Sequence, residues 1–247
     1  MRILGVIPAR YGSTRFHAKA LVDIQGKPMI QHVYERSSEA LSLDKVIVAT
    51  DHPEILNVVE KFGGQAIMTK ESHPSGTDRC YEAYLNLNET YDYIINIQGD
   101  EPFIQAKPID ECAELLDGET ELATMISKIK DLETLINPKI AKVVVNEFRE
   151  AIYFSRQVIP YLRDVDLEDY LDNHTFYKHV SIYAYRTDVL KKITSLSTGV
   201  LEEAEKLEQL RWIEHGFRIK TGVTEHESFG IDTEDDLIKA LKIFKNT

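Results

Sequence analysis

The sequence predicts an α/β fold in which helices cover both faces of a largely parallel sheet. Short apolar runs rich in β-branched residues alternate with amphipathic runs through the first half of the chain, which is the pattern of successive βα units. The 247 residues are enough for a sizeable core. No repeat, low-complexity segment or Gly/Ser linker interrupts them. We therefore expect one domain over residues 1–247.

The expected elements follow one another in chain order. In the first half the strands are Ile3–Ile7, Lys45–Thr50, Gln65–Thr69 and Tyr93–Gln98. Pro28 and Pro53 stand where helices begin, and Gly63 stands where the second helix ends. The later elements are strands Ala141–Val145, Ala151–Phe154, Val180–Ala184 and Ile219–Val223, a helix over about Leu201–His215, and a final helix from Thr233. Residues 160–177 are irregular and fit a flap, an interface element or a solvated loop.

The composition excludes several classes of protein. The formal net charge of -12 argues against a general nucleic-acid surface, because counterion release needs many clustered Lys and Arg side chains. No run approaches the roughly 18 consecutive apolar residues of a membrane helix, and the first residues suggest a strand rather than a secretory leader. We therefore expect a cytoplasmic protein with no membrane partner. Cys80 and Cys112 are the two cysteines, too few for a disulfide framework and without the spacing of a zinc site.

The connection after the first expected strand, residues 8–19, concentrates phosphate-binding chemistry. It reads P-A-R-Y-G-S-T-R-F-H-A-K and contains no acidic residue. It carries two hydroxyl and three cationic side chains: Ser13, Thr14, Arg10, Arg15 and Lys19. The hydroxyls can donate hydrogen bonds to phosphate oxygens, and the cations can neutralise their charge. The P-loop and dinucleotide patterns are absent, and on these residues alone a basic solvated turn stays open as an alternative.

Nine short motifs run through the chain, from P-A-R-Y-G-S-T-R near the start to G-I-D-T-E-D near the end. The others are G-K-P-M-I at Gly26–Ile30, V-A-T-D at Val48–Asp51, H-P-S-G-T-D-R at His73–Arg79, N-I-Q-G-D-E-P at Asn96–Pro102, Y-F-S-R at Tyr153–Arg156, H-V-S-I-Y-A-Y-R at His179–Arg186 and K-L-E-Q-L-R at Lys206–Arg211. In this order and spacing the sequence resembles, almost end to end, the 3-deoxy-manno-octulosonate (KDO) cytidylyltransferases, also called CMP-KDO synthetases. The resemblance implies a three-layer nucleotidyltransferase fold of the nucleotide-diphospho-sugar transferase type, with a mixed, largely parallel sheet.

The resemblance implies that CTP is bound by the first loop and by the segment H-P-S-G-T-D-R. That segment precedes an expected helix near Thr77, whose N-terminus would expose free amides, and the resemblance makes Arg79 a donor to the cytosine base. The residues themselves allow a plainer role, in which Ser75 or Thr77 caps the helix and Asp78 favours its positive end. The implied nucleotide-binding residues are Ala9, Arg10, Ser13, Thr14, Arg15, Lys19, Ser75, Gly76, Thr77, Arg79 and Gln98.

Two carboxylates far apart in sequence are expected to hold a metal ion. Asp100 follows an apolar strand at its carboxyl end, the edge where open α/β sheets build their sites. Asp232 precedes the last expected helix. The resemblance implies that both hold Mg²⁺ against the triphosphate, and Mg²⁺ prefers oxygen ligands and usually joins one or two carboxylates to substrate phosphates. The alternatives are a turn residue at Asp100 and a helix-start residue at Asp232, beside the cap Thr233.

The acceptor site is expected late in the chain. By position, six residues match those that line the sugar pocket of the family: Gln98, Arg156, His179, Tyr183, Glu208 and Gln209. Each has an ordinary alternative. Tyr183 and a lone strand histidine are often structural, and Glu208 and Gln209 lie in an expected helix where either side chain could face solvent.

These expectations combine into one reaction, CTP + KDO → CMP-KDO + pyrophosphate, catalysed by a homodimer with Mg²⁺ as cofactor. The implied catalytic residues are Arg10, Arg15, Lys19, Asp100 and Asp232. Alternatives are a cytidylyltransferase for another sugar acid, such as a sialic acid or an amino derivative of KDO, and a non-catalytic nucleotide-sugar sensor. One departure concerns the first loop, where the family usually reads S-T-R-L-P-G-K-P and this chain reads S-T-R-F-H-A-K-A. Loss of the prolines predicts a less stiff loop.

Overall fold

The fold is built on one mixed sheet. A computed structural model describes residues 1–12, 16–226, 230–231 and 233–244. Within them the strand order is β11-β7-β10-β6-β1-β4-β5, with β8 and β9 attached beyond the bend of β10. The strands are β1 Ile3–Ala9, β4 Lys45–Thr50, β5 Ala66–Met68, β6 Tyr93–Asn96, β7 Leu122–Lys128, β8 Lys142–Val145, β9 Ala151–Ser155, β10 Tyr177–Arg186 and β11 Ile219–Val223. Strands β6, β1, β4 and β5 are parallel, whereas β10 runs antiparallel to β6 and β7.

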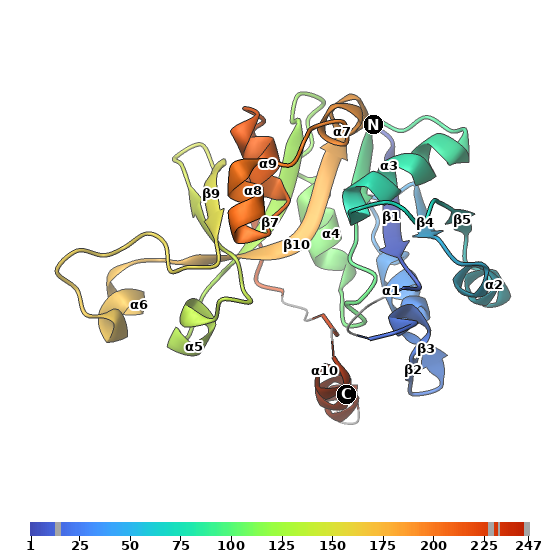
Figure 1. The fold of residues 1–247 in the computed structure, drawn as a ribbon, viewed down its shortest axis with the longest axis horizontal. Helices are drawn as coiled ribbons and strands as arrows, with labels where there is room; N and C mark the ends of the chain where they lie inside the picture. Colours follow the sequence, from blue (N-terminus) through green and yellow to red (C-terminus); the bar gives the residue numbers. More distant parts are fainter. Residues whose placement is uncertain (13–15, 227–229, 232, 245–247) are drawn as a thin grey trace.

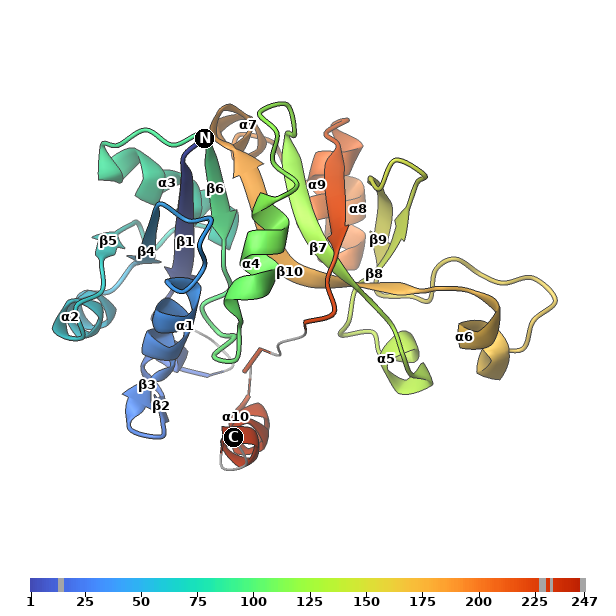
Figure 2. The same ribbon diagram turned by 180° about the vertical axis from the view of Figure 1, so that it is seen from behind.

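Helices cover both faces of this sheet, so that the molecule has three layers (Figures 1 and 2). One face carries α1 Met29–Ser37, α2 Pro53–Lys61 and α4 Ala106–Ala113. The other carries α3 Gly76–Leu87, α7 Thr187–Ile193, α8 Val200–Glu205 and α9 Gln209–Glu214. Burial of aliphatic side chains between the layers supplies the main driving force for this arrangement. The three-layer, mixed-sheet fold expected from the sequence is confirmed.

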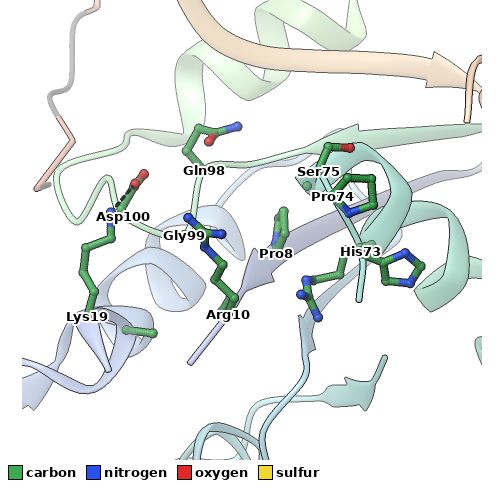
Figure 3. A pocket seen from close by; sticks show the side chains of 13 residues that line it. Pro8, Arg10, Lys19, His73, Pro74, Ser75, Gln98, Gly99 and Asp100 are labelled. Atoms are coloured by element: carbon green, nitrogen blue, oxygen red, sulfur yellow. Dashed lines mark hydrogen bonds and ion pairs between the residues drawn. The ribbon is translucent and has the colours of Figure 1, made fainter. Parts of the chain in front are cut away.

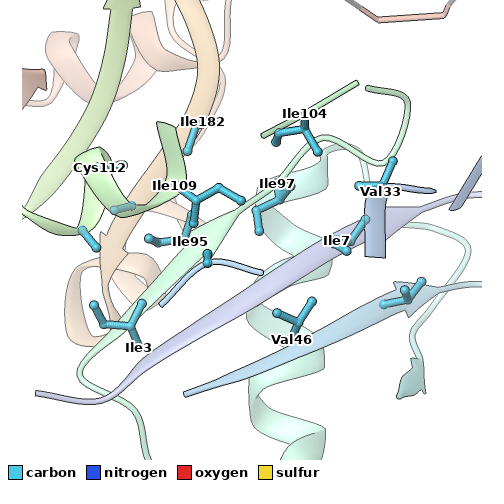
Figure 4. Packing of buried hydrophobic residues seen from close by; sticks show 14 of the residues in the cluster. Ile3, Ile7, Val33, Val46, Ile95, Ile97, Ile104, Ile109, Cys112 and Ile182 are labelled. Carbon is cyan, nitrogen blue, oxygen red and sulfur yellow. The ribbon is translucent and has the colours of Figure 1, made fainter. Parts of the chain in front are cut away.

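The core is divided by the sheet into two clusters. Ile7 and Ile95 point to the first face, where they pack with Val33 of α1 and Ile109 of α4 (Figure 4). Leu4 and its neighbours point to the opposite face and pack against α3, α7 and α9. This alternation is what the two-residue period of a strand buried on both faces requires. Both cysteines are fully buried free thiols, one in each cluster.

The C-terminal helix α10, Glu234–Phe244, stands apart from these layers and packs under the loops that follow β1 and β6. A small apolar cluster joins them: Ile24, Met29 and Ile231 are buried, with Phe16, Phe103, Leu237 and Leu241 around them. The helix lies beside the hairpin of β2 Asp23–Ile24 and β3 Lys27–Pro28 in Figures 1 and 2. The C-terminal segment is thereby brought against the loops after β1 and β6, whereas the N-terminus lies at the opposite end of the molecule (Figure 1).

Most expected strands are confirmed, with shifts at their ends, as are the helix starts near Pro28 and Pro53. The expected continuous helix over Leu201–His215 is wrong. It is two helices, α8 and α9, separated at Lys206, which has a left-handed φ of 53°. A non-glycine residue in this conformation cannot continue an α-helix. The break sends α9 in a new direction, and Glu208 stands directly before it.

The irregular stretch of residues 160–177 forms an arm that projects from the end of β10 (Figure 1). It contains a short 3₁₀ turn at Leu167–Asp169 and helix α6 at Tyr170–Asn173. Its own apolar cluster, with Tyr170 and Phe176 stacked at a centroid distance of 5.7 Å, packs against α5 Leu132–Ile136. Among the described residues, no helix has the length and apolar character needed to cross a membrane.

Candidate active site

A cavity of about 280 Å³ opens at the carboxyl ends of β1 and β6. Its wall is formed by the loop after β1, the segment before α3 and the turn after β6: Pro8, Ala9, Arg10, Lys19, Ala20, His73, Pro74, Ser75, Gly76, Arg79, Gln98, Gly99 and Asp100 (Figure 3). This is the edge at which open α/β sheets place ligands, because the connections diverge there and leave a crevice. Three of the lining side chains are cationic, so the cavity suits an anion.

Lys19 and Asp100 form an ion pair at one side of the cavity. Lys19 Nζ lies 2.7 Å from Asp100 Oδ2, and both side chains keep some exposure, so the pair is open to a ligand. Lys19 begins a 3₁₀ turn, Lys19–Leu21, whose preceding residue Ala18 has a left-handed φ of 49°. Ala18 stands where the family usually has glycine, and an L side chain is strained there.

Close backbone packing holds the Asp100 turn in place. A Cβ added at Gly99 would lie 2.6 Å from the carbonyl oxygen of Pro8, so no other residue fits without a shift. Asp100 in turn accepts a hydrogen bond at its backbone oxygen from the amide of Ile231, at 2.9 Å. The chain that leads to the last helix therefore passes directly beside the Asp100 carboxylate. Asp232 itself lies outside the described residues.

Asp51, at the end of β4, joins two walls of the cavity. Its Oδ2 lies 2.9 Å from Arg79 Nη2 of α3, and its Oδ1 accepts the amide of Tyr11 at 2.9 Å. Both side chains of the ion pair are almost fully buried, at 5% exposure for Asp51 and 4% for Arg79. Arg79 also donates to Thr69 Oγ1 at 2.7 Å. One carboxylate thus fixes the loop that carries Arg10 and orients the guanidinium that lines the cavity.

The N-terminus of α3 is capped by Ser75. Its hydroxyl oxygen accepts the amide of Asp78 at 3.2 Å, and its proton goes to Asp78 Oδ2 at 2.6 Å. This confirms the capping role allowed by the sequence. Gly76 leaves room for Pro8, because a Cβ there would lie 3.3 Å from the proline ring. Because Ser75 and Gly76 line the cavity, the start of α3 adjoins it, and a helix N-terminus favours an anionic or carbonyl group.

Thr77 turns away from the cavity. Its side chain is 2% exposed, and its hydroxyl donates to Glu208 Oε2 at 2.8 Å and lies 3.2 Å from the hydroxyl of Tyr185. Asn96 Nδ2 donates to the same tyrosine at 3.1 Å. Burial raises the pKa of Glu208, and the Thr77 hydroxyl opposes that rise. The base contact expected for Thr77 would have to use its backbone.

Two aromatic residues expected at the acceptor, His179 and Tyr183, lie on β10 with their rings 4.8 Å apart. Tyr183 is 8% exposed, and its hydroxyl has no hydrogen-bond partner in the described part of the chain. His179 Nε2 lies 2.9 Å from Thr124 Oγ1, whose proton goes to the carbonyl of Ile182. Its ring therefore donates, and desolvation lowers the pKa of His179 to about 3, which keeps it neutral. A buried hydroxyl without a partner is costly unless a ligand or water satisfies it.

Arg156 follows β9 and is held by backbone oxygens. Its guanidinium donates to the carbonyls of Glu205, Lys206 and Pro138 at 2.7, 3.3 and 3.1 Å. Lys142, fully buried, donates to the Arg156 carbonyl at 2.6 Å. These bonds tie Arg156 to the break between α8 and α9. Gln209 is buried in the first turn of α9.

The expected residues thus divide into two groups. One lines the cavity: Ala9, Arg10, Lys19, Ser75, Gly76, Arg79, Gln98 and Asp100. The other gathers around β10 and the α8–α9 break: Arg156, His179, Tyr183, Glu208 and Gln209. Ser13, Thr14, Arg15 and Asp232 lie outside the described residues. The sequence reasoning assigned no role to Asp51, Tyr185 or Asn96, although all three stand in the quoted motifs, because their partners are far away in sequence.

Comparison with known proteins identifies the class. Residues 4–220 match the family described as cytidylyltransferase. The chain is 53% identical, over 100% of its length and 99% of the relative's, to a 3-deoxy-manno-octulosonate cytidylyltransferase of Parabacteroides distasonis. It is 55% identical to a protein of the same name from Cytophaga hutchinsonii, over 96% of this chain and 95% of the relative.

The solved structures agree with the sequence relatives. A CMP:2-keto-3-deoxy-manno-octonic acid synthetase complexed with CTP has a TM-score of 0.92 and 40% identity, covering 100% of this chain and 99% of that one. A 4-diphosphocytidyl-2C-methyl-D-erythritol synthase from Anaerococcus prevotii, 15% identical with a TM-score of 0.65, shares the fold, covering 99% of this chain and 98% of that one. Fold and cavity together are those of a nucleotidyltransferase. The chain belongs to the family of 3-deoxy-manno-octulosonate cytidylyltransferases.

Proposed function

We propose that the protein transfers CMP from CTP to KDO, giving CMP-KDO and pyrophosphate for lipopolysaccharide biosynthesis. The observation that carries the proposal is the cationic cavity at the sheet edge, with Lys19, Arg10 and Arg79 around it, in a chain with full-length family relatives of that name. In the reaction a hydroxyl oxygen of the sugar acid bonds to the α-phosphorus of CTP. The bond from that phosphorus to the bridging oxygen breaks, the hydroxyl proton is lost, and pyrophosphate departs.

The chain's own residues would contribute position and charge. Arg10 and Lys19 lie where they can neutralise the triphosphate and the departing pyrophosphate. The exposed amides at the start of α3 and the Arg79 guanidinium offer donors to the oxygen and nitrogen acceptors of cytosine. Because Asp51 holds both Arg79 and the amide of Tyr11, the base-binding and phosphate-binding walls keep a fixed distance.

The donor set fits Mg²⁺. Asp100 presents a carboxylate oxygen to the cavity, and the chain toward Asp232 passes beside it. Within the described residues no group of three or more His, Cys, Asp or Glu side chains could hold a metal by itself. This suits an ion that takes one or two carboxylates and completes its shell with phosphate oxygens and water. Bound there, Mg²⁺ would supply charge neutralisation at the phosphates. Lys19 already holds the Asp100 carboxylate in position.

The acceptor is assigned to the region around β10 and the start of α9. Glu208 stands directly before α9, Tyr183 and His179 lie on β10, and Arg156 follows β9. The chemistry of these residues matches a polyhydroxylated sugar acid. Arg156 supplies a cation for the acid group, and hydroxyl groups can bond to the Glu208 carboxylate and to the Tyr183 hydroxyl, which has no partner in the described part of the chain. We also expect a homodimer in the cytoplasm. Mass measurement in solution and fractionation of cells test these two expectations.

The direct test is pyrophosphate release by purified protein with Mg²⁺ and KDO. CTP should support a rate far above those of ATP and GTP, and KDO should exceed sialic acid and amino derivatives of KDO. Lys19→Ala should lower kcat and kcat/KM together, because the lost charge matters most as pyrophosphate leaves. Lys27→Ala is the matched control, since Lys27, on the β2–β3 hairpin outside the cavity, pairs with Glu35 of α1. Comparable rates with a purine nucleotide, or binding of CTP without turnover, would contradict the proposal.

A further inference from the structure

A row of buried hydrogen bonds crosses from the centre of the sheet to Glu208. It joins Asn96 of β6, Tyr185 of β10, Thr77 of α3 and Glu208 before α9, and we call it the Asn96–Glu208 chain. Asn96, Thr77 and Tyr185 are almost fully buried, at 3%, 2% and 0% exposure. Four elements that are distant in sequence thus meet in one polar line inside an otherwise apolar layer.

With Glu208 ionised, the protons available fix the direction of every bond in this chain. Thr77 has one hydroxyl proton and gives it to Glu208 Oε2 at 2.8 Å. Tyr185 must therefore donate its own proton to Thr77 Oγ1, at 3.2 Å. Asn96 donates an amide proton to the tyrosine oxygen at 3.1 Å. All three donors point toward the carboxylate, and such a chain strengthens its last bond by mutual polarisation.

This carboxylate has little other support. Burial raises the pKa of Glu208, and Asp78 on α3 raises it further. Tyr183, Tyr185 and Cys80 also face it, and none of them carries a positive charge. Arg211 on α9 lowers its pKa from a distance, but the guanidinium is held by Glu202 through two bonds, at 2.6 and 2.7 Å. The Ser75 hydroxyl also lowers the pKa of Glu208, though less than Thr77 does, and its proton goes to Asp78 Oδ2 at 2.6 Å. Thr77 is therefore the principal donor that favours the ionised form.

The position of Thr77 gives the chain a role in the reaction. Thr77 is the second residue of α3, and the residues before it, Ser75 and Gly76, line the cavity assigned to the nucleotide. Its side chain points the opposite way, to the carboxylate assigned to the acceptor. The first turn of α3 therefore presents its backbone to the nucleotide, and its Thr77 side chain supports the Glu208 carboxylate that meets the acceptor.

We propose that Thr77, backed by Tyr185, is a positioning residue for the acceptor. It fixes the Glu208 carboxylate in an ionised, oriented state, so that Glu208 accepts a hydrogen bond from a hydroxyl group of the sugar acid. The proposal rests on the proposed function for the identity of the acceptor. In this proposal, Glu208 selects a substrate hydroxyl that donates a hydrogen bond because the Asn96–Glu208 chain keeps its carboxylate ionised and oriented.

The test compares Thr77→Val, which keeps the shape and removes the hydroxyl, with Thr77→Ser, which keeps the hydroxyl. Thr77→Val should raise the KM for KDO roughly tenfold, the usual order for one lost hydrogen bond to a charged group. The dissociation constant of CTP, measured by calorimetry without acceptor, should change less than twofold. Thr77→Ser should restore the KM for KDO. The pH at which acceptor binding weakens should move upward in Thr77→Val, because its Glu208 takes up a proton more readily.

A second readout needs no substrate. The carboxyl carbon of Glu208, labelled with ¹³C and assigned by comparison with Glu208→Gln, reports its pKa by NMR. That pKa should rise in Thr77→Val and return in Thr77→Ser. If Thr77→Val does not fold, Tyr185→Phe removes the hydroxyl that donates to Thr77. This variant should raise both the KM for KDO and the pKa of Glu208, each by less than Thr77→Val would.

Three outcomes would overturn the proposal: an unchanged pKa of Glu208 in Thr77→Val, equal KM values for the Val and Ser variants, or parallel losses of CTP and KDO binding. Failure of the proposed function is distinguishable. It would show as absent turnover of KDO by the wild-type protein, while the NMR titration would still decide whether Thr77 controls Glu208.

Discussion

The buried ion pair between Asp51 and Arg79 allows a quantitative prediction. Asp51→Ala leaves a guanidinium of 4% exposure without its carboxylate and removes the acceptor of the Tyr11 amide. Breaking one partner of a buried pair costs about 3–5 kcal/mol, and each kcal/mol shifts Tm by roughly 2–4 °C in a domain of this size. Calorimetry should therefore show Tm lower by roughly 6–20 °C. Asp51→Asn, which keeps an acceptor for the amide, should lose less.

A double-mutant cycle separates this ion pair from simple loss of packing. Arg79→Leu together with Asp51→Ala leaves no unpaired charge, so the double variant should be less destabilised than the sum of the single variants. The expected coupling is about 1–3 kcal/mol. Urea denaturation of the four proteins measures it. Additive effects would refute the reasoning, because they would show that neither partner depends on the other for its stability.

Three further predictions concern single positions. Asp100→Asn keeps the size of the side chain but removes the charge, so turnover should collapse while Tm changes little; a protein that unfolds instead would assign Asp100 a structural role. Because the pKa of His179 is lowered from its ordinary 6.5 to about 3, the unfolded chain binds the proton more tightly, and stability should be lost as pH falls from 6.5 toward 3; His179→Gln should flatten that loss in urea denaturation, and an unchanged slope would show that His179 is not neutral by burial. Ala18→Gly should stabilise the free protein by up to about 1 kcal/mol in the same assay, since φ is 49° there, and a lower midpoint would contradict strain at Ala18.

The elements with a simple periodic pattern could be predicted from the sequence. The strands that hold Ile7, Val48 and Ile95 are apolar runs between turn residues, and their burial on both faces makes them recognisable. The break at Lys206 could not be predicted, because the apolar spacing of Leu201, Leu207 and Leu210 suits one continuous helix and a left-handed lysine leaves no mark in composition. Such a conformation is selected by tertiary contacts.

For the candidate site, too, some residue roles could be predicted from the sequence and others could not. Lys19 and Asp100 were expected together, and their ion pair at the cavity is consistent with a shared role. Thr77 looked like a base contact or a cap, yet Ser75 makes the cap and Thr77 bonds to Glu208. Asp51 stood in a recognised motif without a role. Its two partners lie 40 and 28 residues away along the chain, so only the folded sheet shows that they meet.

The contact between Ile231 and the Asp100 turn has a consequence for how the protein is made. Ile231 bonds to the Asp100 turn and packs into the apolar cluster beside Phe16 and Phe103, so a segment synthesised long after β6 holds the turn that carries Asp100. Translation runs from the N-terminus at about 5–20 residues per second, and the sheet from β1 to β6 can form while the remainder is still being synthesised. Asp100 should therefore reach its final position only after Ile231 has been synthesised. A message truncated shortly before the codon for Gly230 should yield a folded but inert product.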